Sequence, residues 1–264
     1  MNKFYQLKVL EVKKETQDCV SVSFDVPYEL HETFNYKPGQ YLTLKFNLNG
    51  KEIRRSYSLC SSPVIEKSLR ISLKLVKNEL VSNHINNTIK VGDFINVMPP
   101  DGRFFVDVKK ENSKTYYLFS AGSGITPIFS ILKTVLLTEE CSYVYMIYGN
   151  RTENSILFKK ELDKLIEKYG DRFILEYTLS HPNSNWNDLW KPSKEQIFRK
   201  GRIDTKLVKW FINEFPLYAK NAEYYICGPE TMIENTKKTL KAIDVPNERI
   251  FFESFERTNS NDSP

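Results

Sequence analysis

The sequence lacks any long apolar run: no stretch approaches the roughly 20 residues that a membrane-spanning helix requires. No apolar segment typical of a signal peptide follows Met1. Cysteine is scarce and scattered, since Cys19, Cys60, Cys141 and Cys227 are too far apart for the closely spaced pairs of a zinc site. We therefore expect a soluble cytoplasmic protein with reduced thiols, no membrane contact and no metal site.

The sequence also lacks a strong charge imbalance. Its 38 basic and 33 acidic side chains leave a net charge of +5, and they are interspersed along the chain. This balance argues against nucleic acid as the main partner but accommodates an anionic cofactor or an acidic protein. A hydrophobic content of 41% argues against disorder, and 264 residues suffice for two modest domains.

Short segments that alternate apolar and polar residues occupy the first part of the chain, at residues 4–10, 19–24, 40–46 and 69–75. Such segments are typical of antiparallel strands. Asn49 and Gly50 form a hairpin signal between two strands, and a short helix is expected near residues 81–88. We predict an antiparallel β-barrel domain over residues 1–110.

A polar stretch at residues 109–114 separates this part from a different pattern. After it, apolar strands are expected at residues 116–119, 143–148, 173–179 and 224–227. Helical apolar faces lie between them, formed by Phe158, Leu162, Leu165, Ile166 and Tyr169 and by Leu207, Trp210 and Phe211. This alternation predicts an α/β domain with a doubly wound parallel sheet over residues 115–256. Residues 257–264 are expected to be a polar tail or the start of a linker.

Three separate motifs carry the functional signal: Arg-Ser-Tyr-Ser at 55–58, Gly-Ser-Gly-Ile-Thr-Pro at 122–127 and Cys-Gly-Pro-Glu-Thr-Met at 227–232. Each alone is weak, because Arg and Tyr are common on strands and paired glycines are common in loops. In order and spacing, however, they resemble the ferredoxin-NADP reductase superfamily. Residues 36–42, 54–62 and 148–152 are similar to the reductase subunits of the phenylacetyl-CoA epoxidase family.

The first motif suits a flavin. Arg55 can offer two parallel hydrogen bonds to a phosphate, and Tyr57 lies two residues further along the same strand face. The resemblance implies that Ser56 belongs to the site, that Tyr57 packs on the isoalloxazine ring and that Ser58 hydrogen-bonds to flavin N5. Taken alone, the tetrapeptide would be an ordinary strand with an exposed arginine.

The resemblance implies FAD as the flavin, through a second segment. Lys74, Leu75 and Val76 match the strand beside the ring and the ribityl chain, and Leu80, Val81 and Ser82 match a helix start whose amides hold the pyrophosphate. Close relatives have glycines just before this helix start, where the present sequence has Asn78, Glu79 and Leu80.

The second motif, with Gly122, Gly124 and Ile125, lacks the third glycine of the usual dinucleotide fingerprint. Instead, we expect Thr126 to cap a helix that begins at Pro127, so that the helix N-terminus faces a nucleotide pyrophosphate.

The choice between NADPH and NADH depends on the ribose. An NADH enzyme typically has an acidic side chain after the second strand, where this sequence has Arg151. Ser180 and Arg202 stand where NADPH-using relatives bind the 2'-phosphate. NADPH is therefore favoured over NADH, with a plain surface role for Arg151 as the alternative.

The third motif ends the last core strand of the expected sheet. The resemblance implies that Cys227 lies against nicotinamide C4 as a positioning group, with Gly228 and Pro229 turning the backbone and Met232 beginning the next helix. A buried strand cysteine is the alternative. Near the end, Phe255 is a candidate lid over the flavin, and Glu253 a carboxylate that supports Ser58.

The resemblance implies hydride transfer from NADPH to FAD, followed by release of single electrons to a ferredoxin or iron–sulfur domain, or to an oxygenase or epoxidase component. The 2Fe-2S cluster is expected on a further domain or a separate partner, because this sequence has no C-x4-C-x2-C pattern. We favour a chain that is part of a longer reductase. A catalytically silent flavin- or nucleotide-binding regulatory subunit is the alternative function.

Overall fold

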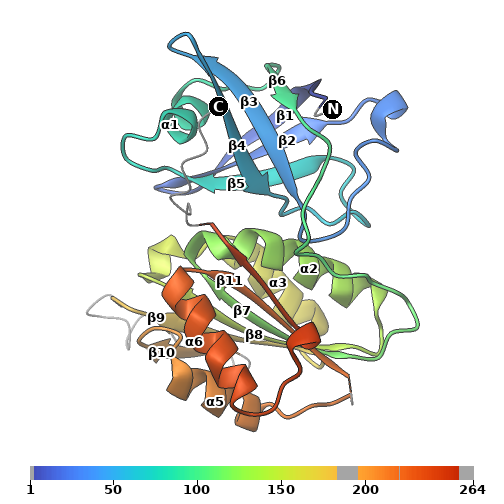
Figure 1. Ribbon diagram of the computed structural model, residues 1–264, viewed down its shortest axis with the longest axis vertical. Helices are drawn as coiled ribbons and strands as arrows, with labels where there is room; N and C mark the ends of the chain where they lie inside the picture. The colour runs from blue at the N-terminus through green and yellow to red at the C-terminus, as the bar shows by residue number, and fades with distance from the viewer. Residues whose placement is uncertain (1–2, 183–195, 220, 256–264) are drawn as a thin grey trace.

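The structure is a computed structural model that describes residues 3–182, 196–219 and 221–255. These residues form two domains, with the N-terminal domain drawn above the C-terminal one in Figure 1. The tail predicted at residues 257–264 lies outside the described residues. None of the described helices is long and apolar enough to cross a membrane.

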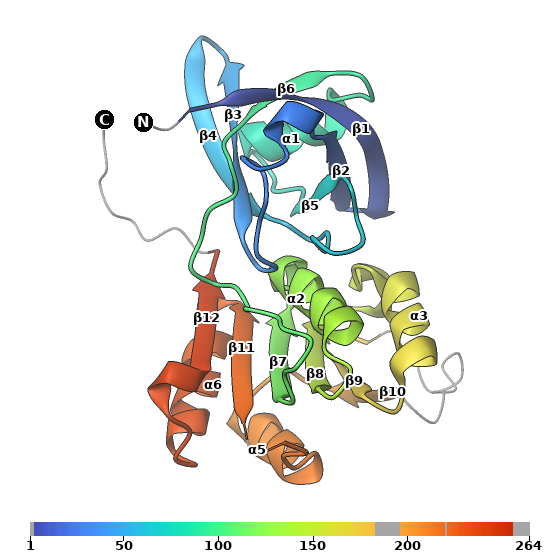
Figure 2. The ribbon, with the colours of Figure 1, turned by 90° about the vertical axis from the view of Figure 1, so that its right-hand side faces the viewer.

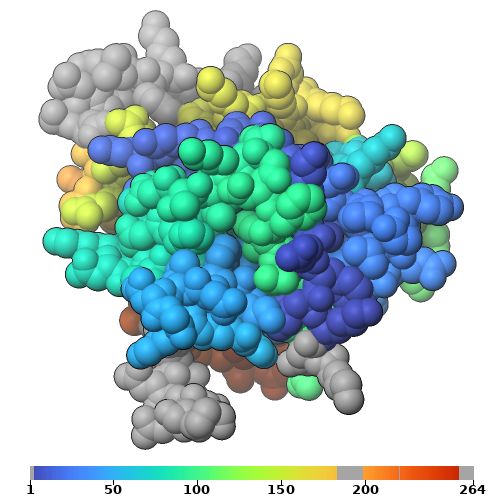
Figure 3. Space-filling model, turned by 90° about the horizontal axis from the view of Figure 1, so that it is seen from above, coloured from blue at the N-terminus to red at the C-terminus, as the bar shows by residue number. Residues whose placement is uncertain are grey.

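The first domain is the predicted antiparallel barrel, with strand order β4-β3-β6-β1-β2-β5 among the described residues. A short antiparallel bridge between Leu59 and Ile71 joins the two ends of this sheet. Seen from above, the domain covers much of the second one (Figure 3). Its elements are β1 (Tyr5–Thr16), β2 (Cys19–Asp25), η1 (Tyr28–Leu30), β3 (Tyr41–Leu48), β4 (Lys51–Ser58), β5 (Leu69–Lys74), α1 (Leu80–Asn87) and β6 (Phe94–Val97).

The hairpin between β3 and β4 follows from its sequence. Asn49 and Gly50 both have positive φ angles, of 52° and 73°, as a tight two-residue turn requires. The turn sets a register that pairs Leu48 with Lys51 and Tyr41 with Ser58. Because side chains alternate across a strand, Arg55 lies on the same face as Tyr57 at the end of β4.

The second domain has a parallel sheet of order β10-β9-β8-β7-β11-β12 among the described residues, as predicted. Strand β10 was not predicted. The elements are β7 (Thr115–Ala121), η2 (Gly122–Gly124), α2 (Ile125–Thr138), β8 (Tyr143–Asn150), η3 (Glu153–Ser155), α3 (Lys159–Tyr169), β9 (Phe173–Leu179), β10 (Gln196–Lys200), α5 (Thr205–Glu214), β11 (Ala222–Gly228), α6 (Glu230–Lys241), η4 (Asn247–Arg249) and β12 (Ile250–Ser254).

Helices cover both faces of this sheet (Figure 2). Alternate residues of β7 face opposite sides, so that Tyr116 packs in the core under α2 and α3, whereas Tyr117 packs in the core under α5 and α6. Leu162 of α3 and Phe211 of α5 are fully buried, in agreement with the predicted apolar faces. Phe158 is also buried but precedes α3, with a φ of 57°.

Polar contacts hold helix α2 against the barrel. Lys133 of α2 forms an ion pair with Glu66, and the Thr134 hydroxyl donates to Ser62 Oγ at 2.8 Å. Arg70 of β5 forms an ion pair with Glu161 of α3 at 3.0 Å. These contacts fix the position of the carboxyl ends of the parallel strands relative to the barrel.

Candidate functional site

The carboxyl ends of β7 and β11 lie side by side at the switch point of the parallel sheet. The chain continues from β7 through β8, β9 and β10 on one side, whereas β12 lies beyond β11 on the other. In open α/β sheets, ligands bind in the crevice at such a point. The second and third sequence motifs both begin here, at Gly122 and Cys227.

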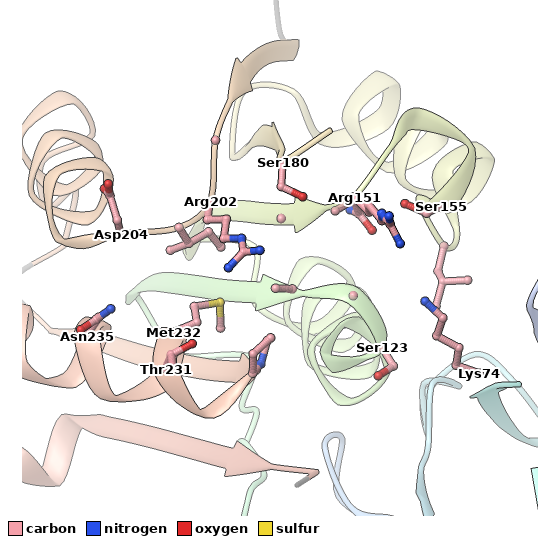
Figure 4. Close-up of a pocket in the computed structure, with 18 of the residues that line it drawn as sticks. Lys74, Ser123, Arg151, Ser155, Ser180, Arg202, Asp204, Thr231, Met232 and Asn235 are labelled. Atoms are coloured by element: carbon pink, nitrogen blue, oxygen red, sulfur yellow. The ribbon is translucent and has the colours of Figure 1, made fainter. Parts of the chain in front are cut away.

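A cavity of about 660 Å³ opens at this crevice. We call it the crevice cavity. Figure 4 shows Arg202 extending across it, with Ser180 and Arg151 along one edge and Lys74 entering from the barrel. Its lining includes the predicted residues Gly122, Arg151, Ser180, Arg202, Pro229 and Met232.

The start of α2 differs from the prediction. Thr126 was expected to cap a helix that begins at Pro127, but the helix begins at Ile125 and Gly124 is its N-cap residue. The Thr126 hydroxyl instead donates to the Ser123 carbonyl at 3.0 Å. The prediction was wrong because the 3-10 turn η2 leads directly into α2, so Gly124 already has helical backbone angles and no side-chain cap is used.

The two glycines of the second motif serve different purposes. Apart from Gly122 and its two chain neighbours, none of the described residues has an atom within 4 Å of the position that a Cβ on Gly122 would take, and the φ of Gly122 is 56°. Its backbone is therefore open to the crevice cavity. A Cβ on Gly124, in contrast, would lie 2.2 Å from the Cys227 carbonyl oxygen, so Gly124 allows α2 to pack against the end of β11.

Only part of the third motif lines the crevice cavity, since Cys227 and Gly228 are not among the described residues of its lining. The side chain of Cys227 is completely buried, and burial together with nearby Glu253 raises the pKa of its thiol well above the ordinary value. Gly228 packs closely against Met232 and Ala121. Met232 was expected to begin a helix, but α6 begins at Glu230 and Met232 is its third residue.

A second cavity, of about 460 Å³, lies between the barrel and the start of α2. We call it the barrel cavity. Its lining brings together the predicted residues Arg55, Ser56, Tyr57, Ser58, Lys74, Val76, Ser82, Thr126 and Phe255. Four residues predicted for the flavin site are not among the described residues that line this cavity. Val81 packs in the barrel core, Leu80 is exposed, and Leu75 and Glu253 are partly buried.

The two cavities meet, because Lys74 and Ser123 line both of them. Lys74 ends β5 of the barrel, and Ser123 lies in η2 of the second domain. A ligand in one cavity can therefore approach a ligand in the other at this boundary.

Ser58, which lines the barrel cavity, contacts Glu253 of β12. The Ser58 hydroxyl donates to Glu253 Oε2 at 3.3 Å, although the two residues are 195 positions apart. Burial raises the pKa of Glu253 to about 7, even though the hydrogen bond from Ser58 acts in the opposite direction. A carboxyl group with this pKa exchanges its proton near neutral pH.

Several lining residues were missed by sequence reasoning. Ser123 and Thr231 stand inside recognised motifs, and Gly149 and Asn150 lie in the segment 148–152. Asp204 carries a recognisable signal as the N-cap of α5, because it accepts from the Leu207 amide at 2.8 Å. Others had no local signal. The missed lining residues are Asp18, Cys19, Ser72, Leu73, Lys77, Asn78, Glu79, Ala121, Ser123, Gly149, Asn150, Ser155, Leu157, Gly201, Ile203, Asp204, Thr231 and Asn235.

The residues present fit a flavin and a nicotinamide nucleotide. The barrel cavity combines an aromatic wall at Tyr57 with the Arg55 guanidinium and the N-terminus of α1, a set suited to a ring system that carries phosphate. The crevice cavity combines the bare backbone of Gly122 with two arginines. Both volumes lie in the range typical of ligand sites.

Fold and site together define a two-domain oxidoreductase of the kind that binds FAD and a nicotinamide nucleotide. A model of the oxidoreductase FAD-binding domain matches residues 6–106, and a model of the oxidoreductase NAD-binding domain matches residues 118–238. The chain belongs to the ferredoxin-NADP reductase superfamily.

Two relatives and one solved structure illustrate the similarity. The chain is 35% identical to one of the subunits of 1,2-phenylacetyl-CoA epoxidase of Escherichia coli, over 97% of this chain and 68% of that protein. It is 32% identical to the 3-ketosteroid-9-alpha-monooxygenase ferredoxin reductase component of Rhodococcus rhodochrous, over 94% of this chain and 64% of the relative. The chain thus spans about two thirds of these relatives. The CS-b5R domains of human Ncb5or, in the NAD+ form, superpose with a TM-score of 0.80 at 25% identity, covering 97% of this chain and 70% of that one.

Proposed function

We propose that the chain passes hydride from NADPH to FAD and then single electrons to an iron–sulfur or oxygenase partner. The observation that carries this proposal is the meeting of the two cavities at Lys74 and Ser123. When bound, the flavin would supply the conversion from two-electron to one-electron chemistry. The protein's part is to hold the two ring systems in contact and to exclude water between them.

In this proposal, each motif has a distinct task. Arg55 binds flavin phosphate, Tyr57 packs on the ring, and Ser58 donates a hydrogen bond to flavin N5. Because Ser58 has a single hydroxyl proton, it then accepts a hydrogen bond from Glu253, which must carry a proton. Phe255, whose ring lines the barrel cavity, is the candidate lid over the flavin. Because Cys227 is completely buried, its proposed contact with nicotinamide C4 requires a local rearrangement when the nucleotide enters.

The proposed partner is supported by the names of the two relatives. One belongs to an epoxidase, and the other is the ferredoxin reductase component of a monooxygenase. We propose that the electrons leave to a 2Fe-2S cluster, on a further domain or a separate protein, that serves an oxygenase of this kind. All four cysteines are free thiols, which supports a reducing, cytoplasmic setting.

An anaerobic titration of the purified protein tests the central proposal. NADPH should bleach the flavin absorbance at roughly tenfold lower concentration than NADH, since binding of the extra phosphate by arginine favours NADPH. Bound flavin that neither nucleotide reduces would support the silent regulatory subunit instead. A protein that remains colourless after addition of FAD would contradict the flavin site.

The arginines of the crevice cavity should decide the choice of nucleotide. We expect Arg202→Ala to raise the KM for NADPH about 10- to 100-fold, because hydrogen bonds to a charged phosphate are lost, and to change the KM for NADH much less. Steady-state kinetics with both nucleotides provide the measurement. Lys209→Ala, an exposed change on neighbouring α5, is the matched control. Equal losses with both nucleotides would contradict a role in binding the 2'-phosphate.

A further inference from the structure

The Glu79 carboxylate binds the same two groups that are expected to hold the flavin diphosphate. Its Oε1 accepts from Arg55 Nε at 2.9 Å, and its Oε2 accepts from the Ser82 amide at 2.6 Å. Glu79 is thereby the N-cap of α1 and the counter-ion of Arg55 at once. The Glu79 carboxylate thus occupies the place between strand β4 and helix α1 where a flavin phosphate would be expected to bind.

This arrangement lies within the barrel cavity, whose lining includes both Arg55 and Glu79. The pair is partly shielded from solvent, with side-chain exposures of 31% for Arg55 and 19% for Glu79. Although burial opposes ionisation, hydrogen bonds from Ser82 and Arg55 keep the pKa of Glu79 below its ordinary value. The carboxylate is therefore charged and well held at neutral pH, and a diphosphate brought to Arg55 would meet a like charge.

We propose that Glu79 is an internal competitor of the flavin diphosphate, and that its displacement sets the affinity of the protein for FAD. This inference rests on the proposed function. Binding of the diphosphate to the Ser82 amide requires the Glu79 contact with that amide to break, and at Arg55 the diphosphate meets the negative charge of Glu79. Both effects weaken the binding of any flavin that carries phosphate there. A flavin without phosphate leaves the contacts intact and is bound without this cost.

The test compares FAD with riboflavin, which has the same ring but no phosphate. Dissociation constants would be measured by flavin fluorescence quenching on the flavin-depleted full chain. Glu79→Gln keeps an oxygen that can accept from the Ser82 amide but removes the charge, so it should bind FAD roughly tenfold more tightly than the original protein. Its affinity for riboflavin should change less than about twofold, because no phosphate approaches residue 79.

Two further variants sharpen the experiment. Glu79→Gly removes the whole side chain and should also bind FAD more tightly, even at the cost of the helix cap. Glu52→Gln is the matched control, because Glu52 accepts hydrogen bonds from Arg54 on the same strand. Glu52 is not among the described residues that line the barrel cavity, so its substitution should not change the affinity for FAD. Thermal melts of all variants verify that they remain folded.

The outcomes separate this inference from the proposed function. If the original protein binds FAD, and Glu79→Gln binds FAD with equal or lower affinity, Glu79 is no competitor while the flavin function stands. Equal tightening for FAD and riboflavin would also overturn the inference, because the effect would not depend on phosphate. If neither flavin binds to the original protein or to any variant, the proposed function fails, and the inference fails with it.

Discussion

Replacing Gly124 by alanine should lower the free energy of unfolding by about 3 kcal/mol, the upper part of the range for overpacking a close contact. The new Cβ would lie 2.2 Å from the Cys227 carbonyl oxygen and 2.5 Å from its carbonyl carbon. Both are backbone atoms of a central strand, so no side-chain rotation can relieve the clash. Either the start of α2 or the end of β11 must shift, and the shift would distort the crevice cavity.

Chemical denaturation of matched variants measures this effect. Gly149→Ala is the control, because its Cβ would lie 3.4 Å from Ala121 and Ile203, at ordinary contact distance. That variant should stay within about 0.5 kcal/mol of the original protein. Equal destabilisation by the two substitutions would show that the close approach of α2 to β11 is not what requires a glycine at position 124.

The second large effect is a pH dependence of the free energy of unfolding that arises from Glu253. Burial raises the pKa of this carboxyl from its ordinary value of 4.5 to about 7. The folded protein therefore holds the proton more tightly than the unfolded chain does. The contribution of Glu253 to the free energy of unfolding is fully present below about pH 4.5. It declines as the pH rises from there to about 7, and above about pH 7 it no longer changes. The total decline corresponds to about 3 kcal/mol.

Glu253→Gln should remove this dependence, because the amide does not ionise. We expect the variant to be more stable than the original protein by about 3 kcal/mol at pH 8 and by less than about 1 kcal/mol at pH 5. Denaturation curves across this pH range, at constant flavin occupancy, provide the measurement. Ser58→Ala should move the pKa of Glu253 further up, because the hydroxyl donates to the ionised form. A Glu253 carboxyl that titrates near pH 4.5 by NMR would contradict the prediction.

Local patterns predicted most of the fold. The alternating segments became the strands of the barrel, and Asn49 with Gly50 formed the expected hairpin turn. Four apolar segments became β7, β8, β9 and β11. These elements were predictable because their side-chain periods and turn residues depend on neighbours only a few positions away. Strand β10 was missed, since it pairs in parallel with β9 although residues 180–195 separate the two strands in the sequence.

The candidate site was predictable only in part. Arg55, Tyr57 and Arg151 stand within a motif or beside a predicted strand end, whereas Arg202 was suggested only by the resemblance. All four line one of the two cavities. The capping of α2 was wrongly assigned to Thr126, because the sequence did not reveal that η2 continues into the helix.

What the sequence by itself determined is the order of the two domains and the location of the three motifs, all of which depend on short-range patterns. Only the tertiary structure decided that Ser58 meets Glu253, that Glu79 binds Arg55, that Cys227 is buried and that the two cavities meet at Lys74 and Ser123. The physical reason is that these contacts join residues far apart in the chain. Their distances, burial and pKa shifts exist only once the barrel and the parallel sheet are packed together.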